Sequence, residues 1–256
     1  MKLRLLSLIG SLFCAIALVA VEPAPSAQQP ILVSVHGAWG GGWQMKKVTP
    51  LLEAKGWKVY RPSLSGLGEH YHTTSPDIGL ATHIDDIVNF ILFEDLHDIV
   101  LLGHSYGGMV ITGVADRIPE RIKKLVYLDA LLPVDGESVM SLVKKTGSFD
   151  VTKMVKDGFI VPNWVKPDKP LPKDVPQPFK TFTDPIALKN QASAAKISAV
   201  YILTVDPGKK PEEDDFFPSS ERAKARGWPV IVMEADHNPQ WRKPEATATL
   251  LDAQGR

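Results

Sequence analysis

The chain has 256 residues, of which 44% are hydrophobic and 23% are charged, so it is long enough for one large domain or two small ones. Its 29 Lys and Arg residues balance 29 Asp and Glu residues, which leaves no formal net charge. This balance removes the electrostatic case for nucleic acid or an anionic membrane surface as a partner.

The first residues have the pattern of a secretory signal peptide. Lys2 and Arg4 precede an apolar run from Leu5 to Val21, and small residues and proline follow it. An uncleaved membrane anchor is the alternative, because the run is near the minimum of about 17 residues that crosses a bilayer. The flanking pattern favours cleavage, with a signal peptide and short linker over 1–27. The only cysteine, Cys14, lies in this run, so the cleaved protein would have no disulfide, thiolate metal site or cysteine nucleophile.

Six short apolar runs rich in β-branched residues predict buried parallel strands. They lie at Ile31–Val35, Trp57–Arg61, Ile99–Leu102, Leu125–Leu128, Val200–Val205 and Val230–Met233. Helix-like stretches alternate with them, at Lys46–Lys55, Leu80–Phe93, Tyr106–Arg117 and from Pro244 through Leu251. The alternation predicts an α/β fold with a mostly parallel central sheet of about six strands, flanked by helices.

The interval from about 133 to 195 interrupts this alternation. It contains eight prolines, which argues against regular core strands or long helices. A connection this long between two core strands is expected to be functional or disordered. Its aromatic residues favour a packed structure, so we interpret it as a Pro-rich cap insertion over the carboxyl edge of the sheet.

The strongest local motif is Gly103-His104-Ser105-Tyr106-Gly107. A G-x-S-x-G match alone is weak, but this one follows a predicted buried strand and precedes a predicted helix. A tight strand–turn–helix exposes a serine hydroxyl and directs the N–H groups of a helix toward it. The context therefore predicts Ser105 as a nucleophile, and a plain Gly-rich turn is the alternative.

A serine hydroxyl needs a base and an orienting acid, which follow it in the order serine, acid, histidine when the serine lies on such a turn. His237, the last of seven histidines, follows the last predicted strand and is the predicted base. Asp206, which follows the strand Val200–Val205, is the predicted acid. The alternatives are Asp129, at the end of the strand Leu125–Leu128, and Asp214 or Asp215 farther along the loop.

A second glycine cluster, HGAWGGGW at 36–43, directly follows the first strand. An oxyanion hole needs two backbone N–H donors, one from the residue after the nucleophile and one from a loop such as this. We predict Tyr106 and Ala38 as the donors, with Trp39 as the alternative to Ala38. Trp39 and Trp43 are predicted to bind the substrate. The cluster lacks the Gly-Lys-Ser/Thr ending of a phosphate-binding P-loop.

Five segments together resemble the α/β-hydrolase esterases of the plant hydroxynitrile lyase and methylesterase type and their bacterial relatives. The segments are HGAWGGGW (36–43), GHSYGG (103–108), VYLDALLP (126–133), YILTVD (201–206) and ADHNP (235–239). The resemblance covers most of the chain after the signal and is weakest in the cap. It implies the same roles for Ser105, His237, Ala38 and Tyr106, and it favours Asp206 as the acid. Hydroxynitrile lyases carry a lysine directly after the histidine, where this chain has Asn238, which counts against lyase activity.

We therefore expect a single α/β-hydrolase domain over 28–256, with the cap at about 133–195. The expected function is hydrolysis of a small carboxylic ester or lactone through an acyl-enzyme. A cofactor-free perhydrolase or haloperoxidase-like enzyme, or a non-catalytic ligand-binding protein, is the alternative. We expect no cofactor, no metal, no nucleic acid and no membrane association after cleavage, in an exported, periplasmic or secreted protein. The sequence leaves the oligomeric state open.

Overall fold

The computed structural model describes residues 29–146 and 150–255. The predicted signal peptide and Cys14 lie outside these residues. Six parallel strands form the central sheet in the order β2-β1-β3-β4-β8-β9. Their bounds are β1 Ile31–Val35, β2 Lys58–Tyr60, β3 Ile99–Ser105, β4 Ile122–Ala130, β8 Ser198–Val205 and β9 Val230–Glu234. The α/β fold and the six predicted strands are confirmed, and four of the strands extend beyond the predicted runs.

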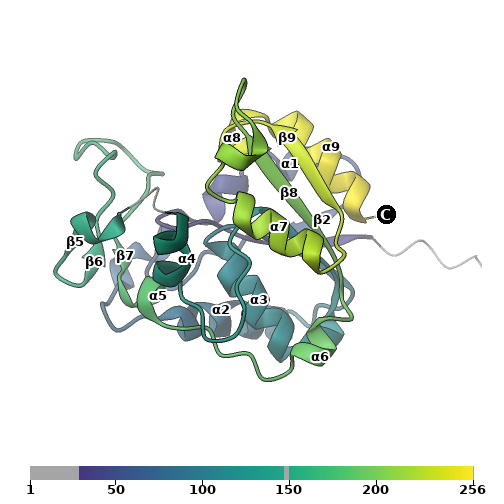
Figure 1. Cartoon of the computed structure of the whole chain (residues 1–256), viewed down its shortest axis with the longest axis horizontal. Coiled ribbons are helices and arrows are strands. Elements are labelled where there is room, and N and C mark those ends of the chain that lie inside the picture. The colour runs from purple at the N-terminus through teal and green to yellow at the C-terminus, as the bar shows by residue number, and fades with distance from the viewer. Residues whose placement is uncertain (1–28, 147–149, 256) are drawn as a thin grey trace, which may run out of the picture.

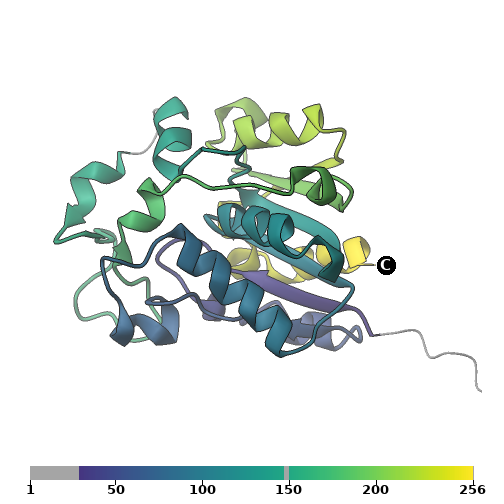
Figure 2. The same ribbon diagram turned by 90° about the horizontal axis from the view of Figure 1, so that it is seen from below.

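Helices cover both faces of this sheet (Figures 1 and 2). Their bounds are α1 Thr49–Glu53, α2 Leu80–Phe93, α3 Gly107–Arg117, α7 Phe217–Ala225, α8 Pro239–Arg242 and α9 Pro244–Gly255. The prediction for Lys46–Lys55 was too long, because a 3₁₀ turn precedes α1 and Pro50 lies in its first turn. Helix α7 was not predicted, because its buried residues Ser219, Ser220 and Ala223 form no apolar stripe in the sequence.

Alternate side chains of each strand enter two separate cores. Leu32 of β1 and Leu102 of β3 pack in the core that α1 and α9 cover. Val33 and Leu101, their neighbours in sequence, pack on the other face, in the core that α2 and α3 cover. Because successive strand residues point to opposite faces, a strand buried on both sides has the continuous apolar sequence seen here.

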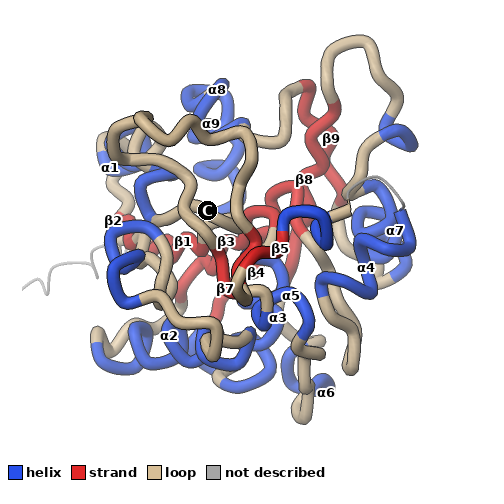
Figure 3. The backbone as a smooth tube through the Cα atoms, turned by 90° about the vertical axis from the view of Figure 1, so that its left-hand side faces the viewer, coloured by secondary structure: helices blue, strands red, loops and turns tan. Residues whose placement is uncertain are grey.

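Within residues 133–146 and 150–195, short elements connect β4 to β8, and we call this segment the cap (Figures 1 and 3). Its elements are α4 Val139–Thr146, β5 Val155–Lys156, β6 Phe159–Ile160, β7 Gln177–Pro178, α5 Lys180–Thr183 and α6 Gln191–Ala194. Most of them lie at the carboxyl end of the sheet, but the last, α6, lies at the opposite end, near the C-terminus of α3. Strands β5, β6 and β7 pair in a small antiparallel sheet. The N–H of Val175 donates to the carbonyl of Trp39 at 2.9 Å, which ties the cap to the loop after β1.

No helix within residues 29–146 and 150–255 has the length and apolarity to cross a lipid bilayer.

Candidate active site

Ser105 ends β3, on the sharp turn between that strand and α3. Its backbone φ is +54°, in the left-handed region that residues with a side chain seldom adopt. The two motif glycines make this turn possible. A Cβ on Gly103 would lie 2.7 Å from the carbonyl oxygen of Gly107, and one on Gly107 would lie 2.6 Å from that of Val35. The tight turn leaves Ser105 half-buried, with its hydroxyl at the carboxyl edge of the sheet.

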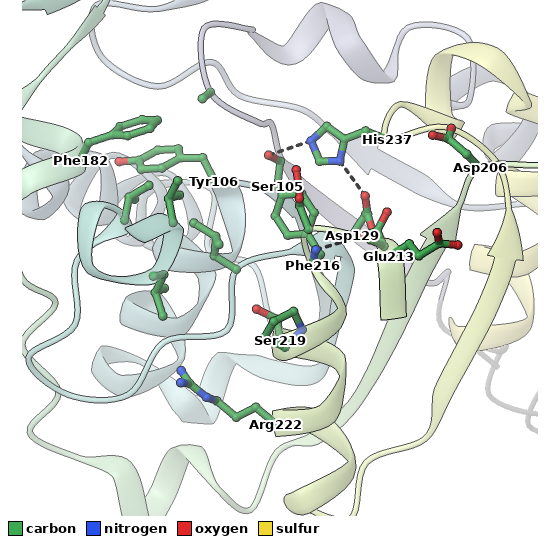
Figure 4. A pocket seen from close by; sticks show the side chains of 18 of the residues that line it. Ser105, Tyr106, Asp129, Phe182, Asp206, Glu213, Phe216, Ser219, Arg222 and His237 are labelled. Atoms are coloured by element: carbon green, nitrogen blue, oxygen red, sulfur yellow. Dashed lines mark hydrogen bonds and ion pairs between the residues drawn. The ribbon is translucent and has the colours of Figure 1, made fainter. Parts of the chain in front are cut away.

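His237 lies on the loop between β9 and α8, directly beside Ser105 (Figure 4). The Ser105 hydroxyl donates to Nε2 of His237 at 3.0 Å, and Nδ1–H of His237 donates to Oδ2 of Asp129 at 2.6 Å. The imidazole therefore has one nitrogen free to accept the serine proton and the other fixed by a carboxylate. This arrangement can turn a serine hydroxyl into a nucleophile.

Asp129 supplies this carboxylate from near the end of β4. The residue is fully buried, and its other oxygen, Oδ1, accepts the N–H of Thr204 on β8 at 3.0 Å. Its backbone φ is +46°, which belongs to the bulged end of β4. Burying a carboxylate costs free energy unless the group is paired. The ion pair with His237 and the hydrogen bond from Thr204 offset this cost for Asp129.

The structure contradicts the prediction of Asp206 as the orienting acid. Asp206 follows β8 as expected, but its carboxylate pairs with Lys209 at 2.8 Å and its side chain is 45% exposed. The main chain explains this, because the carbonyl of Asp206 accepts the N–H of Lys209 in a tight turn. Asp206 lies at the rim of the cavity beside Ser105 (Figure 4), while the alternative residue Asp129 contacts His237.

The carboxylates around His237 determine its charge. Burial lowers the pKa of His237, but the hydrogen bond and charge of Asp129 outweigh burial, and the pKa rises above the ordinary 6.5. Asp214 and Asp236 act in the same direction. Asp214 is half-buried, and burial together with the negative charge of Asp129 raises the pKa of its carboxyl to about 6. Asp214, one of the alternative acids, thus raises the pKa of His237 through its charge. Within the described residues, no hydrogen bond joins Asp214 to His237.

The loop after β1 lies on the other side of Ser105, and its Ala38 and Trp39 line the same cavity as Ser105 and Tyr106. The N–H of Trp39 donates to Oε1 of Gln177 at 2.7 Å, so this amide already has a partner. The N–H of Gly37 likewise donates to Gln44 at 3.1 Å. These bonds fix the loop on both sides of Ala38 and favour Ala38 over Trp39 as a donor toward the cavity.

A cavity of about 450 Å³ opens beside Ser105 and His237, a size typical of small-molecule sites. Its lining includes the apolar residues Trp39, Leu131, Val139, Leu142, Phe182 and Phe216. It also includes the charged residues Asp206, Lys209, Glu213, Asp214, Asp215 and Arg222. The two lining cations are already paired, Lys209 with Asp206 and Arg222 with Glu137.

Two aromatic residues of this wall were not among the site residues predicted from the sequence. Phe216 stacks on the imidazole of His237, with ring centroids 4.8 Å apart, and Phe182 of α5 stacks on Tyr106 at 5.8 Å. Phe216 lies in the loop between β8 and α7, and Phe182 lies in the short helix after β7, where the sequence has no motif to mark either residue.

The prediction that Trp43 binds the substrate is wrong. Trp43 packs edge-on against Trp241 with ring centroids 5.7 Å apart, and it is not among the residues that line the cavity. Trp39 does line it and packs against Trp164 and Phe182 of the cap. Among the described residues, no group of three His, Cys, Asp or Glu side chains could hold a metal ion.

Residues 32–250 match the model of the alpha/beta hydrolase family. The chain belongs to this family. One relative is a carbendazim hydrolyzing esterase of Nocardioides sp. strain SG-4G, 36% identical over 242 residues that cover 87% of this chain and 98% of the relative. Another is methylesterase 1 of Arabidopsis thaliana, 33% identical over 118 residues that cover 45% of each chain.

Solved structures share the fold of this hydrolase. An extracellular alpha/beta-hydrolase from a Paenibacillus species superposes with a TM-score of 0.67 at 24% identity, over 89% of this chain and 99% of that chain. A methylesterase from Arabidopsis superposes with a TM-score of 0.68 at 23% identity, over 88% of this chain and 98% of that one. The relatives named here as esterases support hydrolysis of a small-molecule ester as the reaction class.

Proposed function

We propose that this hydrolase is a serine esterase that cleaves a small carboxylic ester through an acyl-enzyme, with Ser105 as the nucleophile. The observation that carries the proposal is the hydrogen-bonded series Ser105, His237 and Asp129, at 3.0 and 2.6 Å. The esterase names of the relatives support the same reaction class.

In the proposed reaction, Oγ of Ser105 attacks the ester carbonyl while Nε2 of His237 takes its proton. Asp129 holds the other ring nitrogen as a donor and stabilises the imidazolium that forms. The backbone N–H groups of Ala38 and Tyr106 are the proposed donors to the developing oxyanion. His237 returns the proton to the alcohol, which leaves, and water then cleaves the acyl-serine with His237 again as the base.

The cavity suggests the general shape of the substrate. The apolar side chains that line it from the loop after β1, α4 and α5 suit an apolar acyl or aromatic group, and its volume suits a small molecule. Because two relatives are named a carbendazim hydrolyzing esterase and a methylesterase, carbendazim and methyl esters belong in the first substrate panel, beside p-nitrophenyl esters of increasing acyl length and lactones.

The test is covalent labelling with a fluorophosphonate, followed by peptide mass spectrometry and turnover of that panel. We expect one modified residue, Ser105, and turnover of at least one ester class. An unlabelled protein would refute the proposal. Labelling with no turnover of any ester would favour the ligand-binding alternative, and peracid formation exceeding hydrolysis would favour a perhydrolase.

The pH dependence follows from the charges around His237. Below its pKa, His237 is protonated and cannot accept the serine proton, so kcat/KM should rise with pH and level off above that pKa. Because Asp129 raises the pKa of His237, the midpoint should lie above the ordinary 6.5. A pH profile of kcat/KM measures it. A midpoint at or below 6.5 would contradict the assignment of Asp129 as the partner of His237.

Trp39 and Trp43 provide a matched pair of substitutions. Trp39→Ala removes a cavity wall, so we expect KM to rise about tenfold, the scale of about 1.4 kcal/mol of lost binding. Trp43→Ala should leave KM within about twofold and mainly lower stability, because the side chain packs on Trp241 outside the cavity. Steady-state kinetics and thermal melts separate the two. Equal effects of both substitutions on KM would contradict these placements.

We also propose that the protein is exported and loses its first residues, on the basis of the signal-like pattern of 1–27. Intact-mass measurement of the protein recovered outside the cytoplasm tests this. An unprocessed amino terminus would contradict it.

A further inference from the structure

His104, the residue before Ser105, is a second buried imidazole beside His237. Only 3% of its surface is exposed, and its ring centroid lies 4.7 Å from that of His237. The ring fills the space under the β1 loop so closely that a Cβ on Gly37 would lie 2.9 Å from its Nδ1. Neither the proposed reaction nor the family resemblance gives this side chain a role.

The hydrogen bonds of His104 determine which of its nitrogens carries a proton. Its Nε2 lies 2.7 Å from the main-chain carbonyl of His237, which can only accept, so Nε2 must be the donor. Its Nδ1 faces the side-chain amide of Gln240 at 3.4 Å, and Gln240 is itself 1% exposed. The amide NH₂ of Gln240 therefore donates weakly to Nδ1, and both partners suit a neutral ring.

The surroundings keep this ring uncharged. Burial and the nearby imidazole of His237 lower the pKa of His104 to about 3, against a smaller opposing effect of its bond to the His237 carbonyl. The other titratable group that acts on it is His36, whose own pKa burial lowers to about 4. His104 thus lies next to His237 as a neutral donor over the whole range in which His237 titrates.

The backbone of His237 lies outside any helix or strand, so its position depends on individual hydrogen bonds such as the one from His104 to its carbonyl. His237 sits between the end of β9 and the start of α8, in a short loop outside both elements. On one side Ala235 donates its N–H to Val205, and on the other Asn238 donates its N–H to Asp236, both at 3.0 Å. The bond from His104 holds the residue between these two points.

We propose that His104 is a positioning residue, whose Nε2–H fixes the main chain of His237 so that its imidazole stays within reach of both Ser105 and Asp129. The inference rests on the proposed function, since it assigns His104 a part in orienting the base. Its neutrality matters as well, because a cation at this distance would oppose the imidazolium that forms on His237 during the reaction.

The test compares two variants of similar size. His104→Met fills the space without a donor, whereas His104→Gln keeps an amide N–H that can reach the His237 carbonyl. We expect kcat of His104→Met to fall about 10- to 100-fold, the scale of a misplacement of about 1 Å, with KM within about twofold. His104→Gln should recover most of kcat. Equal kcat in the two variants, or a loss confined to KM, would overturn the proposal.

A measurement on the unaltered protein covers the case in which His104→Met does not fold. Imidazole ¹⁵N spectra should show His104 as the neutral Nε2–H tautomer between about pH 5 and pH 8, while His237 titrates. An Nδ1–H tautomer, or a titrating His104, would overturn the proposal. Absence of ester turnover in the unaltered protein would instead refute the proposed function, and the spectra distinguish the two failures.

Discussion

Ser105→Ala is expected to lower kcat for ester hydrolysis by about 10⁶-fold, the scale seen when the serine nucleophile is removed from a hydrogen-bonded set of serine, histidine and aspartate. In the proposed reaction, the hydroxyl of Ser105 is the group that His237 activates, and alanine leaves no hydroxyl to acylate. Residual hydrolysis should come from the cavity and the oxyanion donors alone. Burst kinetics with a p-nitrophenyl ester and active-site titration measure the loss.

Ser34→Ala is the matched control for this substitution. Ser34 lies in β1, is 1% exposed, and its Oγ has no hydrogen-bond partner among the described residues. Removing this hydroxyl should leave kcat within about twofold, because Ser34 is not a lining residue of the cavity and its hydroxyl makes no hydrogen bond to the described residues of the site. If Ser105→Ala kept activity comparable to Ser34→Ala, Ser105 would not be the nucleophile.

Asp129→Asn is expected to lower kcat by about 10⁴-fold while the protein stays folded. An asparagine here can turn its NH₂ toward Nδ1 of His237, and the imidazole then takes the tautomer that cannot accept the serine proton. The loss of negative charge also lowers the pKa of His237, so the acid limb of the pH profile should move to lower pH.

Asp206→Asn is the comparison that tests this choice of acid. It removes a half-exposed ion pair with Lys209 at the rim of the cavity, a kind of pair that contributes about 0–1 kcal/mol of stability. We expect kcat to stay within about threefold of that of the unaltered protein, because Asp206 lies at the rim of the cavity. A large loss of kcat in Asp206→Asn together with near-normal kcat in Asp129→Asn would reverse the assignment.

Several features could be predicted from the sequence because they depend on local patterns. Continuous β-branched runs marked all six strands, since parallel strands buried on both faces must be apolar throughout. The Gly-x-Ser-x-Gly turn identified Ser105, because the backbone of such a turn has no room for side chains at the glycines. The position of His237 after the last strand followed from the chain order of the fold.

The acid could not be decided in the same way. Asp129 lies near the end of β4 and Asp206 directly follows β8. Because β4 and β8 are neighbours in the sheet, topology brings both residues to the same edge near His237. The direction of each side chain then depends on local backbone geometry. The left-handed φ of Asp129 directs its carboxylate to His237, whereas the turn after β8 pairs Asp206 with Lys209.

The two tryptophans of the loop after β1 show the same limit. Both lie in one glycine-rich motif, but the 3₁₀ turn at 42–45 directs Trp43 to Trp241, nearly 200 positions later in the chain. Trp39 instead donates hydrogen bonds to Gln177 and to the carbonyl of Ile160, both in the cap, and it lines the cavity.

The sequence by itself thus determined the strands of the sheet, the turn that carries the proposed nucleophile and the position of the proposed base, because each depends on residues adjacent in the chain or on strand order. Only the tertiary structure decided which aspartate contacts His237, which residues line the cavity and what His104 contacts. Those depend on contacts such as Asp129 with His237, 108 positions apart, where side-chain direction rather than sequence spacing sets the distance.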